Sequence, residues 1–205
     1  MSYQVNFAGQ NLNDFCKVLN VTKTILPPRE NFSKEVPSMM GTYFTGFKYG
    51  VREITLEVAL VGISREDLAT KIRALADVLD VKNPSKLEIN DEPNLYYYAV
   101  LDGDTKFEKK FNTATCELKF ICHNPVAYSQ TWKTFQANAT NIFTIENDGT
   151  TDTTCIVDVD FENDSCFFQC TNPMGSTVLV GVPKDATKPI VPETDVLLKD
   201  RRAHV

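Results

Sequence analysis

The most regular pattern in the chain lies at residues 51–61, where hydrophobic and polar side chains alternate. The hydrophobic members are Val51, Ile54, Leu56, Val58 and Leu60. Alternation with a period of two is typical of a strand that buries one of its faces. We therefore predict a long, half-buried strand that ends at Gly62.

A helical period follows directly after this strand. Its hydrophobic positions are Leu68, Ile72, Leu75 and Leu79. Their spacings of four, three and four residues place them on one face of a helix. Ser64, with Asp67 three residues later, forms an approximate capping box. The sequence therefore predicts a helix over 65–80.

Strand composition resumes after the helix, at residues 86–90, 95–101 and 115–122. Asp102-Gly103-Asp104 is predicted as a hairpin turn after the second of these strands. Within that second strand, Tyr96, Tyr97 and Tyr98 alternate in direction, so we expect core packing on one side and a protein interface on the other.

Residues 26–46 do not have the composition of a core. They contain three prolines, mixed charges, Met39-Met40-Gly41 and then a strand-like end at 42–45. This composition predicts an exposed loop or arm, an element that often serves a neighbouring subunit.

The second part of the chain shows only strand signals, at residues 141–146, 153–161, 166–171 and 177–182, separated by turn clusters. This spacing favours a β-sandwich or part of one. Residues 134–183 also lack Lys and Arg and carry seven carboxylates. Such a composition shift indicates a domain boundary between 128 and 135, and we predict domains at 1–132 and 133–205. The Pro-rich, charged tail after residue 182 is interpreted as a linker or a last strand.

Composition excludes several classes of protein. The 205 residues carry a net charge of −6, with no run of Lys and Arg, which argues against nucleic-acid binding. The sequence has no apolar run long enough for a membrane span and no signal-peptide pattern, so we predict no membrane association. The six cysteines include no C-x-x-C pair, and we interpret them as reduced, mostly core residues.

Candidate metal and nucleophile sites are weak. Asp158, Asp160, Glu162 and Asp164 alternate like the start of a calcium loop, but Asn163 stands where that loop needs glycine. On a strand these four carboxylates would simply share a solvated face. Cys122 and His123 are adjacent and would point to opposite faces of a strand. We therefore predict no metal site and no cofactor.

Paired carboxylates for glycoside hydrolysis could be nominated at Asp91-Glu92 or at Glu30 and Glu35. Any acidic protein offers such pairs, and the sequence contains none of the common catalytic or nucleotide-binding motifs. We therefore predict that the protein is not an enzyme.

The order of these pieces resembles the N-terminal domain of the distal tail protein of phages with long, non-contractile tails that infect Gram-positive bacteria. The resemblance covers residues 1–132. Its most specific segments are residues 87–93 (Leu-Glu-Ile-Asn-Asp-Glu-Pro) and residues 120–128 (Phe-Ile-Cys-His-Asn-Pro-Val-Ala-Tyr).

The resemblance implies a mainly β fold, with an N-terminal β-sandwich ring domain containing one helix and a peripheral galectin-like sandwich. It implies a structural baseplate protein at the tail tip of the virion, assembled in the host cytoplasm. Its implied partners are five further copies in a hexameric ring, the tail tube, the tail-associated hub, and a receptor-binding protein or cell-wall saccharide. Candidate inter-subunit residues are Pro28, Arg29, Met39, Met40, Tyr43, Asp102 and Gly103.

The second domain is short for a complete galectin-like sandwich. It is truncated, completed by residues 190–205 as a strand, or followed by further modules. A different class of function therefore stays open: a carbohydrate-binding module that attaches to cell-wall glycan through this acidic domain. A tail-associated cell-wall hydrolase is a third hypothesis.

Overall fold

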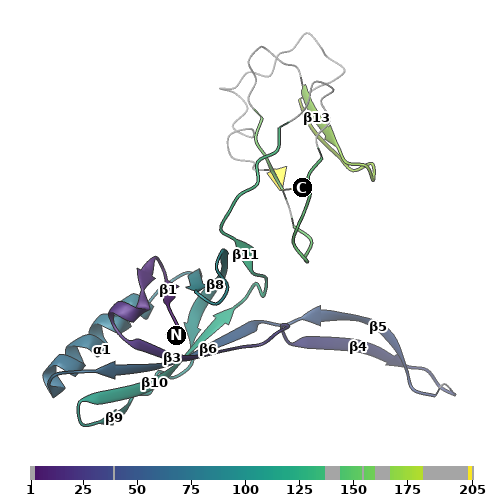
Figure 1. The fold of residues 1–205 in the computed structure, drawn as a ribbon. Coiled ribbons are helices and arrows are strands. Elements are labelled where there is room, and N and C mark those ends of the chain that lie inside the picture. The colour runs from purple at the N-terminus through teal and green to yellow at the C-terminus, as the bar shows by residue number, and fades with distance from the viewer. Residues whose placement is uncertain are drawn as a thin grey trace. The chain divides into compact units, whose positions relative to one another are not determined.

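The alternating stretch is strand β6 (Arg52–Val61), which lies between β10 and β3 in the principal sheet. In the computed structural model β6 pairs antiparallel along its whole length with β10 (Thr113–Cys122). Four inward-facing side chains of β6 are buried: Ile54, Leu56, Val58 and Leu60. The predicted half-buried strand is confirmed by this burial pattern, and its ribbon is labelled β6 in Figure 1.

The structure describes residues 3–38, 40–136, 144–153, 155–159, 167–181 and 203–204. The chain divides into two compact units, Met1–Asn138 and Ala139–Val205. This division does not test independent folding, so the domain limits at 132 and 133 stay a prediction.

The first unit contains a nine-stranded sheet with the order β2-β1-β7-β8-β10-β6-β3. β9 pairs with β10, and β11 pairs with β8. The remaining strands are β1 (Val5–Phe7), β2 (Gln10–Asn11), β3 (Lys17–Lys23), β7 (Ser85–Ile89), β8 (Leu95–Asp102), β9 (Glu108–Lys110) and β11 (Tyr128–Ser129). A 3₁₀ turn (Leu12–Asp14) joins β2 to β3. The described pairings are all antiparallel, which confirms the predicted mainly β fold.

The predicted helix is α1 (Arg65–Leu79). The Ser64 hydroxyl accepts a hydrogen bond from the Asp67 backbone N–H at 3.1 Å, which satisfies a helix-end donor as the capping pattern predicts. Leu68, Leu75 and Leu79 are buried against the sheet, and Ile72 is partly buried at the margin of the core.

The core joins strands that are far apart in the sequence. Phe7 of β1 and Phe120 of β10 meet edge to face, with 4.9 Å between ring centroids. Cys16, Cys116 and Cys122 are buried in the same core as thiols. Burial raises the pKa of Cys16 and of Cys122 to about 11, so these side chains stay neutral and behave as small hydrophobes.

The predicted hairpin turn at Asp102-Gly103-Asp104 is wrong. Asp102 ends β8, and its partner across the sheet is Lys119, which excludes a tight turn at this position. The tight turn instead lies at Phe111-Asn112, because the flanking Lys110 and Thr113 are directly paired between β9 and β10. Sequence analysis missed it because Phe is not a typical turn residue.

The second unit is described in part. β13 (Phe167–Thr171) and β14 (Thr177–Gly181) form a hairpin, which confirms the strands predicted there over the described residues. Of the strand predicted at 153–161, Ile156–Val157 forms β12 and pairs with β15 (Ala203–His204). Residues 144–146 have no strand, and 141–143 lie outside the described residues. The galectin-like sandwich stays a prediction.

Candidate assembly interface on a β-hairpin arm

The segment predicted as an arm is a two-stranded sheet separate from the principal one. β4 (Arg29–Glu35) pairs only with β5 (Thr42–Tyr49), and we call residues 29–49 the arm (Figure 1). All residues of both strands are exposed except Gly46, which is half-buried. An isolated hairpin is marginally stable in water. Its strands therefore offer both faces and both edges for contact with another molecule.

One face of the arm gathers aromatic side chains. The Arg29 guanidinium lies 3.6 Å from the centroid of the Phe47 ring, which meets Tyr49 edge to face at 5.2 Å. Phe44 shares this face, because its partner Ser33 and the Phe47 partner Asn31 are two residues apart on β4. We call Phe44, Phe47 and Tyr49 the aromatic face.

A β-bulge makes this arrangement possible. The pairing of β4 with β5 shifts by one residue between Phe32 and Ser33. Without the extra residue in β5, Phe44 and Phe47 would point to opposite faces, since they are three residues apart. Gly46, opposite Phe32, has φ 147°, a conformation that residues with a Cβ rarely adopt.

The other face of the arm carries mixed charges. Lys48 forms an ion pair with Glu30 at 2.8 Å and lies 5.8 Å from the centroid of the Phe32 ring. Tyr43, opposite Lys34, is 60% exposed. A face of this composition suits a polar interface rather than a core.

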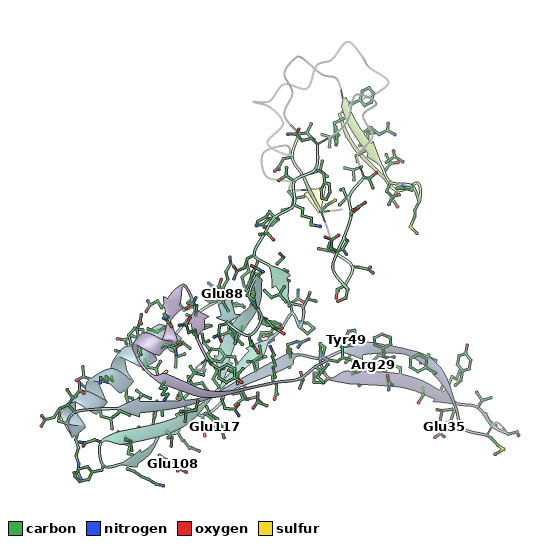
Figure 2. All side chains as sticks on the ribbon, in the orientation of Figure 1. Arg29, Glu35, Tyr49, Glu88, Glu108 and Glu117 are labelled. Atoms are coloured by element: carbon green, nitrogen blue, oxygen red, sulfur yellow. The ribbon has the colours of Figure 1, made fainter. Side chains whose placement is uncertain are left out.

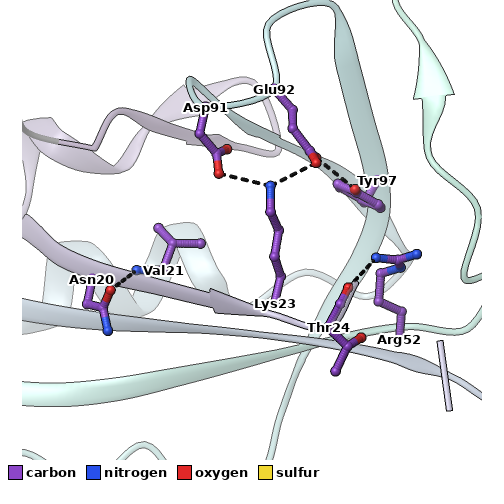
Figure 3. Close-up of polar contacts among 8 residues, drawn as sticks. All are labelled: Asn20, Val21, Lys23, Thr24, Arg52, Asp91, Glu92 and Tyr97. Atoms are coloured by element: carbon purple, nitrogen blue, oxygen red, sulfur yellow. Dashed lines mark hydrogen bonds and ion pairs between the residues drawn. The ribbon is translucent and has the colours of Figure 1, made fainter. Parts of the chain in front are cut away.

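The root of the arm is fixed to the principal sheet through its backbone. The Gly50 N–H donates to the Pro28 carbonyl at 2.7 Å, which continues the ladder between the two strands. The Arg52 guanidinium donates to the carbonyls of Thr24 at 2.8 Å and of Pro125 at 2.9 Å. Arg52 thus ties the two chain segments at the root to the segment after β10. Figure 3 shows its hydrogen bond to the Thr24 carbonyl.

Ion pairs add to this anchorage. The Lys23 ammonium lies 2.9 Å from the carboxylates of both Asp91 and Glu92, and Glu92 also accepts a hydrogen bond from the Tyr97 hydroxyl at 2.8 Å (Figure 3). Burial alone would lower the pKa of Lys23, but the hydrogen bonds to the two carboxylates outweigh it and raise that pKa. The carboxylate pair weighed for glycoside hydrolysis is therefore engaged in holding the arm root.

The three consecutive tyrosines alternate as predicted. Tyr97 points into the core, where burial and its bond to Glu92 raise the pKa of its hydroxyl. Tyr96 and Tyr98 point to the opposite side and cluster with Tyr128 of β11, at centroid distances of 5.4–5.6 Å. Tyr96 is nevertheless only 7% exposed, because that side of the strand is covered locally.

Four of the predicted inter-subunit residues lie on the arm or at its root. Pro28 and Arg29 begin it, Tyr43 lies on β5, and Met40 at the tip is 98% exposed. Met39 lies outside the described residues. Of the other two, Asp102 ends β8 in the principal sheet and Gly103 follows it.

The predicted arm ends at residue 46, whereas β5 continues to Tyr49, so Phe47 and Tyr49 lie beyond the predicted limit. Their alternation with exposed polar residues was the available signal. The anchoring role of Lys23 and Arg52 was not predicted either, because their partners are distant in the sequence.

The remaining candidate site residues do not form a nucleophilic pair or a metal site within the described residues. Cys122 is the buried last residue of β10, and His123 lies in the bend that follows and is exposed. Asp160, Glu162 and Asp164 lie outside the described residues. Within the described ranges, no cluster of three or more His, Cys, Asp or Glu side chains could hold a metal ion, and no helix is long and apolar enough to cross a membrane.

The comparisons with known proteins agree with this architecture. The family model of the phage tail protein RIFT-related domain matches residues 12–122, and the chain belongs to that family. The fold is similar to the crystal structure of the Dit (gp 19.1) protein of phage SPP1, described as a paradigm of the hub adsorption apparatus in phages that infect Gram-positive bacteria.

That similarity has a TM-score of 0.59 at 18% sequence identity and covers 83% of this chain. The chain spans 65% of the length of the SPP1 protein. No curated protein matches in sequence. The predicted resemblance to distal tail proteins is confirmed in family and in fold.

Proposed function

We propose that this protein is a non-enzymatic hub of a phage tail tip. Six copies form a ring that joins the tail tube to the tail-tip hub and carries the components that attach to the host. The protein acts in the virion and is assembled in the host cytoplasm. Membership of a phage tail family and the Dit-like fold support a structural role in the tail.

The arm is the observation that carries the ring proposal. It leaves the principal sheet at a root held by backbone and ion-pair contacts, and the side chains of its two strands are exposed. A contact between one patch and a different patch on the next copy closes into a ring when its rotation is right. An arm at one side of each copy provides such a contact.

The arm contributes a substantial part of the required energy. Phe44, Phe47 and Tyr49 are 53%, 43% and 48% exposed, so each would gain about 2 kcal/mol on full burial. Association of two proteins costs about 4–15 kcal/mol. Burial of the aromatic face alone therefore does not offset the cost of association, and other contacts must add to it. Ring closure adds such contacts, because each copy then has two neighbours.

The remaining predicted contacts complete the proposal. Asp102 and Gly103 lie at the end of β8, outside the arm, and form a second part of the ring interface. Residues 133–205 carry the host-attachment role. The tube and the hub bind the two open faces of the ring.

The test is the solution mass of the full chain, measured by light scattering over a concentration series with negative-stain images of any large species. We expect rings of six copies. The variant Phe44→Ser/Phe47→Ser should weaken self-association by at least about tenfold, because it removes two anchors. Trp132→Ser is the matched control, since Trp132 is an aromatic residue off the arm that is 80% exposed.

A chain that stays monomeric at all concentrations would contradict ring formation by the protein alone. A pull-down on purified cell walls then tests the alternative. Retention of a monomer on cell walls, unaffected by the arm variant, would support the carbohydrate-binding module instead.

A further inference from the structure

The end of the sheet opposite the arm presents a second group of exposed apolar side chains. Val61, Ile63 and Phe111 are 63%, 91% and 79% exposed, and we call them the turn patch. They belong to two turns, from β6 into α1 and from β9 into β10. The Gly62 N–H donates to the Asn112 carbonyl at 2.8 Å, and the Asn112 side-chain amide donates to the Ile63 carbonyl at 3.2 Å. The two turns are thus held side by side.

The patch is held rigidly. The Ile63 N–H donates to the Asp67 carboxylate at 2.9 Å, and Asp67 also pairs with Lys71 at 3.2 Å. The hydrogen bond from Ile63, followed by the one from Lys71, holds the pKa of Asp67 below its ordinary value. Both backbone polar groups of Ile63 are therefore satisfied while its side chain faces solvent, as in a preorganised binding anchor.

Phe111 adopts a conformation that is unfavourable for its residue type. Its φ is 57°, in the left-handed region that Gly and Asn occupy readily and bulky residues do not. The Arg65 guanidinium carbon lies 5.7 Å from the centroid of the Phe111 ring, and most of the ring is exposed to solvent. A strained, exposed aromatic side chain contributes little to the stability of the monomer, which points to a binding role.

We propose that the turn patch binds the tip of the arm of a second copy; this inference rests on the proposed ring. Met40 at the tip is 98% exposed, and a thioether packs favourably against an aromatic ring such as that of Phe111. The charges beside the two surfaces are complementary. Glu35 ends β4 next to the tip, Lys110 precedes Phe111, and neither forms an ion pair within the described part of the chain.

The arm tip that binds the turn patch belongs to a second copy, because the arm and the turn patch of one chain lie at opposite ends of the first unit. The arm joins the sheet at the start of β6, a strand of ten residues, and the turn patch begins at the last of these residues, Val61. Ten residues of strand span about 33 Å, and the arm leads away from the sheet. Figure 2 shows Glu35 on the arm and Glu108 of β9 at opposite ends of the first unit. An arm at one end and its receptor at the other make the head-to-tail contact that a ring requires.

A zero-length carbodiimide cross-link between Glu35 and Lys110 tests this contact. Rings are assembled from an equal mixture of ¹⁴N- and ¹⁵N-labelled full chains, treated, digested and analysed by mass spectrometry. We expect Glu35–Lys110 peptides of mixed isotope composition, which come only from two different copies. The Glu30–Lys48 pair, at 2.8 Å within the arm, is the internal control and should give linked peptides of one isotope only.

Charge reversal provides an independent readout. Glu35→Lys and Lys110→Glu should each weaken ring formation by about tenfold, and the double variant should restore it, because the pair is then reversed. The matched control is Lys109→Glu, which changes the neighbouring residue of β9 and should not be rescued by Glu35→Lys.

The outcomes separate the two proposals. Rings that yield no mixed Glu35–Lys110 peptide and no rescue overturn this contact and leave the proposed function standing. If the linked Glu35–Lys110 peptides carry one isotope only, the arm contacts its own chain, which also overturns the inference. A protein that forms no assembly contradicts the proposed function and this contact together.

Discussion

At the scale of single residues, Gly62 shows how close approach selects an amino acid. It lies where β6 turns into α1, and a Cβ built there would meet the Ser64 carbonyl oxygen at 2.7 Å and the Leu68 backbone nitrogen and Cβ at 2.8 Å. These atoms belong to the helix start and the core, so they have little freedom to move.

Gly62→Ala should therefore lower the free energy of unfolding by about 2–4 kcal/mol, measured by urea denaturation. Gly50→Ala is the control, because its nearest atoms lie at 3.5 and 3.7 Å, an ordinary contact distance. Equal unfolding midpoints for the two variants would contradict the tight turn.

The buried thiols give a second prediction at this scale. With a pKa of about 11, only about one in a thousand Cys16 or Cys122 side chains is a thiolate at pH 8. A disulfide reagent should leave Cys16, Cys116 and Cys122 of the native protein unmodified and label them at once in denaturant. Native labelling of these three at the rate of a small thiol would contradict their burial.

The same shift has a consequence for stability. The unfolded chain loses its thiol protons above about pH 9, whereas the folded chain retains them toward pH 11. This contribution to stability is therefore complete below pH 9 and is lost as the pH rises toward 11.

At the scale of elements, the arm is structurally separable from the sheet. Its described residues contribute no side chain to the buried core, and Pro28 and Gly50 at its two ends are joined by a hydrogen bond of 2.7 Å. The chain can therefore pass from one end to the other through a short turn.

Replacement of residues 29–49 by Asn-Gly should change Tm by less than about 3 °C, because the core is intact, and should abolish self-association. Circular dichroism and light scattering on the same samples check both parts. Loss of cooperative unfolding would show that the arm belongs to the fold, and persistent rings would remove it from the interface.

At the scale of the whole molecule, the two units differ in kind. The first has a continuous core beneath a nine-stranded sheet, whereas the strands described in the second pair only as short two-stranded sheets. Residues 131–136 are exposed and without strand. We expect the first unit to fold without the second.

A chain that ends at Lys133 should therefore unfold cooperatively, with a Tm within a few degrees of that of the full chain. The control is a chain that ends at Phe111, which lacks β10 and with it the main partner of β6, and should not fold. An aggregated or non-cooperative 1–133 chain would contradict the predicted domain limit.

Local sequence patterns were sufficient to predict an element where the spacing of its own hydrophobic residues shows its period. Alternation predicted β6, and the capped four-three-four spacing predicted α1, because burial of one face imposes the period of the element on its side chains. Proline content and mixed charge predicted an exposed arm. The β9–β10 turn could not be predicted in this way, because Phe111 takes a turn conformation against its own preference.

The sequence by itself determined the mainly β class, the helix, the exposed arm and the resemblance to a phage tail family. Of the six predicted core cysteines, Cys16, Cys116 and Cys122 are buried, Cys155 and Cys170 are partly exposed, and Cys166 lies outside the described residues. Only the tertiary structure decided what depends on residues distant in the chain. The strand register across the bulge places Phe44 on the same face of the arm as Phe47 and Tyr49. The ion pairs of Lys23 with Asp91 and Glu92 exist because the fold brings the end of β3 beside the β7–β8 turn. Local preference acts over a few residues, whereas such contacts arise when a shared core fixes the strands in one register.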